Sequence, residues 1–444
     1  MPKTSVIAKK VTGQVARLST WARSTTARLR APRPRIETVV ALDVGSSRIA
    51  CAVAEWRNGT PSLVSSETVQ SYGIRGGEVI DLRRASESIR IAVETVGERA
   101  NADIRSVVLG FSGDVKLNTT FGTLELEGQG RCVNEQDLMR LRRSLVSTGT
   151  PGRRVVHRCD GPFTVGELRG IEQPLGLSGK TLGMAAAFLT VPQERFDNLV
   201  RAVRGAGVEI ENVLPEPLAA SEGALTPDEK ALGTAVLDFG AGGFRGVLWE
   251  GGRVKQLAVC GPERAAGLAG VVAASGGMEE IVLGLAQRFR IAPSTARRIL
   301  TTAWPEQSIE LTAVDGLSRV RVEPKELAAV VEELLLPHVR ALRDGLASFS
   351  IGHAGGVVLA GQGARVPGLL ELVSRHFDGA RVRIGTPKWE AQEPLPPELE
   401  GPGGCAISGL LGFGHEERVR LRQRDAASWW GRFTNNLRRV AASL

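Results

Sequence analysis

Two Asp-x-Gly segments, one in each half of the chain, contain residue types that could bind phosphate. They are VVALDVGSSRIACAV at 39–53, which contains Asp43, and TAVLDFGAGGFRGVLW at 234–249, which contains Asp238. Each pattern predicts two buried strands joined by a small, Gly-rich turn. Backbone N–H groups in such a turn can approach an anion, and the aspartate can reach a metal's water shell. One such turn is common in hairpins, but two copies predict a duplicated phosphate clamp.

A third glycine-rich turn follows in GGVVLAGQGARVPGLLELVSRHF at 355–377. This segment predicts a strand, a turn and then a helix. Gly361 and Gly363 would let the backbone lie flat against a ligand ring. Alone the turn is a weak signal, and its order after the two Asp-x-Gly turns strengthens it.

The composition is that of a soluble globular protein, with 444 residues, 42% hydrophobic and 23% charged. This length predicts at least two lobes. The apolar runs are shorter than the roughly 20 residues that a membrane-spanning helix needs. The five cysteines show no metal-ligand spacing, which is typical of reduced thiols in a cytoplasmic protein.

Basic residues gather at both ends of the chain. Residues 1–36 contain nine Lys or Arg and no acid, and residues 415–444 have a net charge of +4. Because the whole chain carries +8, the middle segment, 37–414, is left with −5. Basic ends on an acidic body favour an anionic membrane surface as the partner and argue against nucleic acid.

The C-terminal stretch has the pattern of an interfacial helix. Arg432, Arg438 and Arg439 lie on the opposite side of an ideal helix from its apolar face. Docking on the protein's own core is the alternative, but the charged stretch 415–428 separates this helix from the body and favours membrane contact. The apolar face is formed by Trp429, Trp430, Phe433, Leu437, Val440, Ala441 and Leu444.

The N-terminal extension, 1–36, has a weaker pattern of the same kind. Apolar residues from Ile7 to Trp21 share one helical face, while Gly13 and several Thr residues disfavour a helix. A second membrane contact and plain disorder both remain open, and the Arg-rich composition also resembles an organelle transit peptide.

The remaining segments predict an α/β body with an insertion. A helix is expected over 79–101, opened by Asp81, followed by a strand at 106–113. Short β-like pieces then surround one helix, 134–147, capped by Asn134, which indicates a compact α+β insertion. The expected organisation is an extension at 1–36, a first lobe at 37–230 with the insertion at about 106–191, a second lobe at 231–388, a return to the first lobe at 389–414, and a charged linker with an amphipathic helix at 415–444.

The order of the three turns resembles the actin/Hsp70/hexokinase ATPase superfamily, and within it the chain is similar to the bacterial FtsA family. The stretch PLGLSGKTL, at 174–182, is the most discriminating, because it belongs to an inserted subdomain that actin and Hsp70 lack. The other segments that carry the resemblance are ALDVGSSRIACAV (41–53), LPEPLAASEGAL (214–225), VVLAGQGARVPGL (357–369) and the C-terminal helix.

The resemblance implies a two-lobed actin-like (ribonuclease H-like) ATPase fold with ATP and Mg in the cleft. It also implies self-association into filaments, binding of the tubulin-like FtsZ, and a place on the cytoplasmic face of the inner membrane at the division site. By this resemblance Asp43, Asp238 and Glu216 surround the metal and the attacking water, with Asp43 and Asp238 near the metal. The implied nucleotide-binding residues are Gly45, Ser46, Ser47, Gly240, Gly242, Gly243, Gly276, Gly277, Gly361 and Gly363.

The second loop departs from the family. The family's Asp-x-Gly-Gly-Gly-Thr-Thr-Asp is here replaced by 238–245, which lacks both hydroxyls and ends in Arg245. The segment 261–275 is extra, and the ribose-contacting Glu and Lys would align with Arg297 and Leu300. Losing phosphate donors and reversing a charge beside the metal should weaken Mg-ATP binding and hydrolysis.

Two accounts of this loop remain open. Arg245 could itself contact phosphate with little need for metal, or the chain could be a pseudo-ATPase with a relaxed site. We favour weak or absent hydrolysis. The competing functions are an actin-like adaptor for pilus assembly and an active ATPase or chaperone of the same superfamily.

Overall fold

The computed structural model describes most of the chain between Ile36 and Ala441. For residues 424–441 only the backbone is described. The described ranges are 36–127, 130–146, 151–260, 276–304, 306–350, 352–389 and 395–441. The predictions for 1–35, for the extra segment 261–275 and for Leu444 therefore lie outside the described residues.

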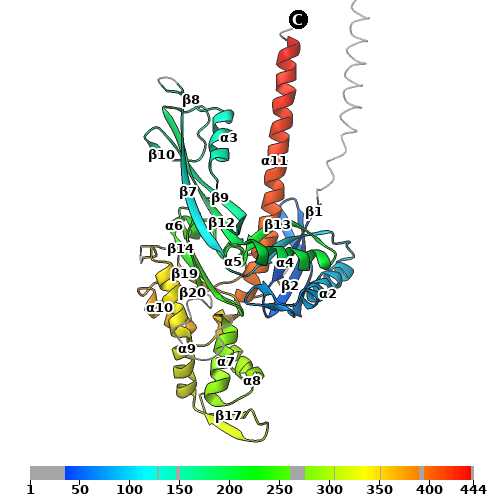
Figure 1. The fold of residues 1–444 in the computed structure, drawn as a ribbon, viewed down its shortest axis with the longest axis vertical. Coiled ribbons are helices and arrows are strands. Elements are labelled where there is room, and N and C mark those ends of the chain that lie inside the picture. The colour runs from blue at the N-terminus through cyan, green and yellow to red at the C-terminus, as the bar shows by residue number, and fades with distance from the viewer. Residues whose placement is uncertain are drawn as a thin grey trace, which may run out of the picture.

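Two five-stranded sheets of the same topology form the two lobes (Figure 1). In each sheet an antiparallel three-stranded meander is extended by two parallel strands, so the two halves share one topology and the predicted α/β fold is confirmed. The first sheet has the order β13-β6-β1-β2-β3, with β1 (Ile36–Val44), β2 (Arg48–Arg57), β3 (Thr60–Gln70), β6 (Ser106–Phe111) and β13 (Glu209–Pro215). The second has the order β16-β15-β14-β19-β20, with β14 (Thr234–Phe239), β15 (Phe244–Glu250), β16 (Arg253–Cys260), β19 (Gly356–Ala360) and β20 (Val382–Ile384).

Helices cover both lobes, and the first of them begins at the N-cap residue that the sequence predicted. Asp81 accepts a hydrogen bond from the backbone N–H of Arg84 at 3.0 Å and so starts α2 as expected. The first-lobe helices are α2 (Leu82–Ala100), α4 (Gln193–Gly205), α5 (Glu216–Ala224) and α6 (Pro227–Leu232). The second lobe has α7 (Met278–Phe289), α8 (Pro293–Thr301), α9 (Pro324–Gly345), α10 (Leu369–His376), the 3-10 turn η1 (Gln362–Arg365) and a hairpin of β17 (Ile309–Thr312) and β18 (Arg319–Val322).

The insertion is a separate layer with its own core. Its four-stranded sheet has the order β10-β9-β12-β7, and α3 (Glu135–Ser144) begins at the predicted cap Asn134. The insertion starts after β6, because β6 is an inner strand of the first-lobe sheet and not part of this layer. Its strands are β7 (Lys116–Glu125), β8 (Arg131–Cys132), β9 (Arg153–Val165), β10 (Leu168–Ile171), β11 (Ser178–Gly179) and β12 (Thr181–Pro192).

Two helices, α5 and α11 (Cys405–Ala441), pack together at the junction of the lobes. Their backbones come unusually close at two glycines. A Cβ on Gly223 would lie 1.9 Å from the Cys405 carbonyl oxygen, and one on Gly409 would lie 1.9 Å from that of Ala219. Only glycine permits this approach, which brings one continuous apolar core from the first sheet to the inner face of the second.

The stretch 415–423 is helical and docked on the body, which differs from the expected linker. Arg418 bonds to Glu211, with Nε 2.7 Å from Oε1, and Arg422 pairs with Glu37. The His415 ring stacks on Trp56 at a centroid distance of 4.6 Å. Two arginines of this stretch are therefore paired with acids of the body. Helix α11 runs unbroken into its C-terminal part, which extends beyond both lobes (Figure 1).

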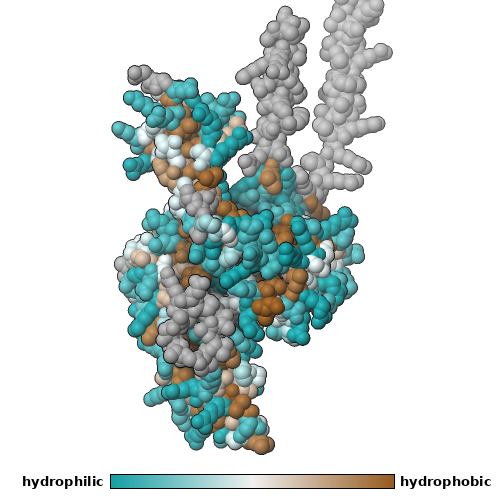
Figure 2. Space-filling view, in the orientation of Figure 1, coloured by the Kyte–Doolittle hydropathy of each residue, from teal (hydrophilic) through white to brown (hydrophobic). Residues whose placement is uncertain are grey.

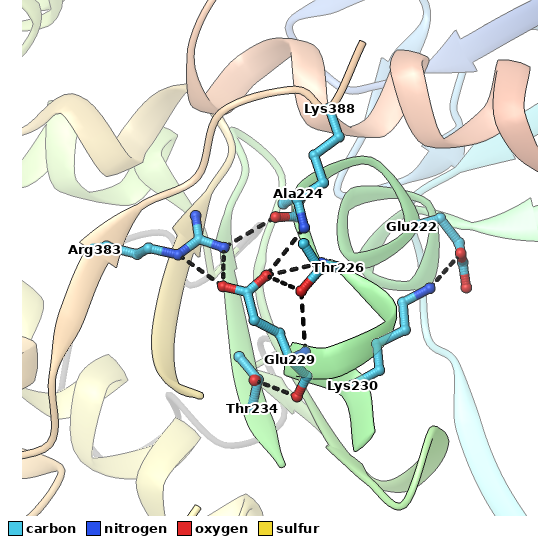
Figure 3. Close-up of polar contacts among 8 residues, drawn as sticks. All are labelled: Glu222, Ala224, Thr226, Glu229, Lys230, Thr234, Arg383 and Lys388. Carbon is cyan, nitrogen blue, oxygen red and sulfur yellow. Dashed lines mark hydrogen bonds and ion pairs between the residues drawn. The ribbon is translucent and has the colours of Figure 1, made fainter. Parts of the chain in front are cut away.

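A polar cluster joins the two chain segments that cross between the lobes (Figure 3). Glu229, on α6, lies where the chain enters the second lobe, and Arg383 and Lys388 lie where it returns. The Glu229 carboxylate is 2.7 Å from Arg383 and 3.0 Å from Lys388. Burial alone would raise the pKa of Glu229, but the hydrogen bonds from Arg383 and Lys388 lower it.

We predict that Glu229→Gln lowers the free energy of unfolding at neutral pH by about 1–3 kcal/mol, because it leaves two half-buried cations without their acid. The pKa of Glu229 is lowered in the folded state, so the stabilisation is present above the unfolded pKa and is lost as pH falls through the folded value. Urea unfolding as a function of pH measures the effect. Glu87→Gln, which breaks a solvent-exposed ion pair with Arg90, is the control, and an equal loss in both variants would contradict the prediction.

Candidate nucleotide site

The three predicted turns meet around one cavity of about 320 Å³ between the lobes. Each turn follows a buried strand of its sheet, so the sheet topology brings them together at the strand ends. The volume is at the lower end of the range for small-molecule sites. The predicted residues on its wall are Asp43, Gly45, Ser46, Ser47, Glu216, Asp238, Gly240, Gly242, Gly361 and Gly363.

The first and second loops touch across the cavity. A Cβ on Gly242 would lie 2.2 Å from the Ser46 hydroxyl oxygen, so this position requires glycine. The same hydroxyl accepts a hydrogen bond from the backbone N–H of Gly77 at 3.0 Å. Ser46 is therefore held by the first lobe while it faces the second.

Three residues predicted to bind nucleotide, Gly243, Gly276 and Gly277, do not line the cavity. They instead determine the shape of the second loop. The Gly243 carbonyl accepts a hydrogen bond from the Gly240 N–H at 3.2 Å. A Cβ on Gly277 would lie 2.2 Å from the Gly243 nitrogen, and Gly276, with φ of 62°, begins the turn that leads there. These glycines allow α7 to start directly against the loop.

The carboxylates of Asp43, Asp238 and Glu216 line the same cavity and influence one another electrostatically. Burial, followed by the negative charge of Glu216, raises the pKa of Asp43 to about 7. The same causes raise the pKa of Asp238 well above its usual range, while Arg245 opposes the shift in both. Asp43 Oδ1 and Asp238 Oδ2 are buried and have no hydrogen-bond partner among the described residues.

Arg245 is buried beside these carboxylates, with 3% of its side chain exposed. In the register of β14 and β15, Arg245 is directly opposite Asp238. At the corresponding position of the first lobe, Asp43 is opposite Ala50. Arg245 Nη1 is 3.4 Å from Glu216 Oε2, and its Nε donates to the Gly113 carbonyl at 3.5 Å. The guanidinium thus lies behind the second loop and reaches into the first lobe.

Glu216 has two partners that restrict its chemistry. Besides Arg245, the Ser112 hydroxyl donates a hydrogen bond to the same oxygen, Oε2. A general base must accept a proton from a water molecule within hydrogen-bond reach. Here Oε2 is already used twice, so a water molecule would have to use Oε1 or displace one of these partners.

The carboxylates do not fit a bound divalent cation. In the part of the chain that the structure describes, no group of three or more His, Cys, Asp or Glu residues is placed to hold a metal ion. The buried guanidinium of Arg245 already supplies positive charge where such an ion would be needed. The turns, by contrast, fit a phosphate-containing ligand, because small residues leave their backbones open to the cavity.

Some lining residues were missed or assigned differently by the sequence reasoning. Arg48 lies on the first-loop wall and donates to the Gly403 carbonyl at 2.6 Å. Arg297, aligned with a lost ribose contact, still lines the cavity and is 2.5 Å from the Glu279 carboxylate. The position of Arg48 directly after the first loop was a usable signal, whereas the Glu279–Arg297 pair depends on how α7 meets α8.

Comparison with known proteins agrees with this architecture. A family model described as the SHS2 domain inserted in FtsA matches residues 113–190, which form the insertion. Cell division protein FtsA of Escherichia coli (strain K12) is 26% identical over 428 residues, which cover 90% of this chain and 97% of that protein. FtsA of Streptococcus pneumoniae serotype 2 (strain D39 / NCTC 7466) is 27% identical, with coverage of 78% and 75%.

A solved structure described as the PilM-PilN type IV pilus biogenesis complex has the same fold, with a TM-score of 0.56 and 17% identity. The alignment covers 85% of this chain and 98% of that one. The two duplicated sheets with a cleft between them define an actin-like ATPase fold. The FtsA-type insertion and the relatives above support an FtsA-like protein.

We predict that Asp43→Asn stabilises the protein at alkaline pH. Because the pKa of Asp43 is raised to about 7, the folded protein holds a proton that the unfolded chain releases between pH ~4 and 7, and stability falls as pH rises through this window. The free energy of unfolding of the variant should therefore be about 1–4 kcal/mol higher than that of the unaltered protein near pH 8, and this difference should vanish toward pH 4. Urea unfolding in EDTA without nucleotide measures this, with exposed Asp103→Asn as control; a gain that does not depend on pH would contradict it.

Proposed function

We propose that this protein is an actin-like cell division protein that tethers an FtsZ-like polymer to the cytoplasmic face of the bacterial inner membrane at the division site. The observation that carries the proposal is α11, a single helix of 37 residues. Its base is fixed to the first lobe by Arg418 and Arg422, and its distal part extends away from the body. A body with such an arm is suited to linking a polymer to a surface.

Among the described helices, none is long and apolar enough to cross a bilayer. Two features support contact with a membrane surface. The distal part of α11 contains no acid beyond Asp425, and its aromatic residues recur with helical spacing opposite the arginines. The basic extension at 1–36 adds a second cationic segment that anionic lipids would attract.

Binding of FtsZ and self-association into filaments are inferred from the FtsA relatives. The surface is compatible with end-to-end association, because apolar side chains are exposed on the insertion and at the far tip of the second lobe (Figure 2). Phe121 on β7 is 61% exposed, and Leu317 between β17 and β18 is 88% exposed. Isolated exposed apolar residues are ordinary, but two groups at opposite ends suit a repeating contact.

We further propose that ATP hydrolysis is weak or absent. Glu216 is held by Ser112 and Arg245, and the second loop offers no hydroxyl to phosphate. The scaffold and the tether, not turnover, would then provide the function. This argues against the alternative of an active ATPase or chaperone.

The other alternative, an adaptor for pilus assembly, shares the fold of the PilM-PilN structure. At 17% identity that likeness concerns the fold alone. The insertion at 113–190 favours the FtsA-like function instead.

We predict that the full chain sediments with vesicles containing phosphatidylglycerol and carries purified FtsZ with it. Trp430→Glu combined with Phe433→Glu should abolish both, because two charges would enter the apolar face of the interfacial helix. Co-sedimentation of both proteins is the measurement. Retained binding of the variant would overturn the assignment of the anchor.

The matched control is Asn435→Glu with Ala442→Glu, which adds the same charge on the opposite face of an ideal helix. It should weaken vesicle binding only modestly. An equal loss in both variants would mean that net charge, and not insertion of the aromatic face, drives binding.

A further inference from the structure

We infer that the Arg245 guanidinium replaces the divalent metal of this cleft, so that the site binds the phosphates of a nucleoside di- or triphosphate without Mg²⁺. The inference rests on the proposed nucleotide site and specifies its ligand as the metal-free nucleotide. It does not depend on the proposed membrane or FtsZ contacts.

The first argument is the place of Arg245 in the fold. It is the cross-strand neighbour of Asp238, so both side chains leave the same face of the second sheet. From there Nη1 reaches Glu216 at 3.4 Å and Nε reaches the Gly113 carbonyl at 3.5 Å. A cation delivered by the second lobe therefore contacts two elements of the first lobe.

The second argument is charge. The carboxylates of Asp43, Asp238 and Glu216 line the cavity, and Arg245 is buried beside Glu216. Burial and the charge of Glu216 raise the pKa of both aspartates, and Arg245 opposes that shift. A permanent cation therefore already acts on this cluster, and it would repel an incoming divalent ion.

The third argument concerns how phosphate would be held. The second loop wraps the guanidinium, with Gly243 O 3.4 Å from Nη1, so the positive charge lies directly behind the loop's backbone. On the opposite wall Arg48 lies directly after the first loop. Arg48 and the backbones of the two loops then line the site of the anion, and the charge of Arg245 acts on it from behind the second loop.

The primary test is calorimetric titration of ATP into the full chain, first in Mg²⁺ and then in excess EDTA. We expect the two dissociation constants to agree within about threefold. Arg245→Ala should weaken binding in EDTA by about tenfold or more, and Arg245→Lys, which keeps the charge, should restore most of it. Arg253→Ala, a second-lobe arginine paired with Glu172 away from the cleft, should bind like the unaltered protein.

A second test uses Mn²⁺ alone, followed by electron paramagnetic resonance. The unaltered protein should leave Mn²⁺ free, because the described carboxylates are not placed to hold a metal ion. If Arg245→Ala does not fold, the Lys variant and the comparison of Mg²⁺ with EDTA still decide.

ATP binding that requires Mg²⁺, or Mn²⁺ binding by the unaltered protein, would overturn the inference. No ATP binding in either condition would overturn it as well. Because vesicle and FtsZ co-sedimentation are measured separately, that result would leave the tethering function standing.

Discussion

Burial of one guanidinium among three carboxylates is the interaction on which the cleft depends. Asp43 comes from the first sheet, Asp238 from the second, and Glu216 from the start of α5, so the two lobes bring their acids to one point. Burial raises the pKa of both aspartates, and Arg245 opposes that shift. Arg245 also bonds across the cleft, where the two Gly-rich loops touch at Ser46 and Gly242.

The packing behind the cleft also holds the two lobes together. Gly223 and Gly409 let α5 and α11 approach so closely that one apolar core passes from sheet to sheet. Glu229 then ties the outgoing chain segment to the returning one through Arg383 and Lys388. The lobes are therefore joined by an apolar contact in the middle and by ionic contacts on either side.

Local signals in the sequence were sufficient for much of this architecture. Asp43 and Asp238 end strands that pair with the next strand along the chain, and such hairpins are determined by a few neighbouring residues. The cap at Asp81 was predictable for the same reason. The pairing of Arg245 with Glu216 was not, because it depends on a contact between residues 29 positions apart on different lobes.

The helical stretch at 415–423 is a second feature that could not be predicted, because it depends on contacts between residues distant in sequence. Its charges predict a solvated linker when read alone, since charged runs without apolar periodicity seldom pack. Their partners, Glu37 and Glu211, lie far away in sequence and become neighbours only after the first sheet forms. Long-range ion pairs thus changed a predicted linker into the base of α11.

This difference matters for the proposed tether. A flexible linker would let the body rotate freely above the membrane, whereas an unbroken helix passes the orientation of the first lobe to its distal end. At 1.5 Å per residue, α11 would be about 55 Å long, so a small tilt at its base moves its tip by several ångströms. The base contacts β1 and β13 through Glu37 and Glu211, and β1 also leads into the loop that contains Ser46. The direction of the arm and the position of that loop therefore depend on the same sheet.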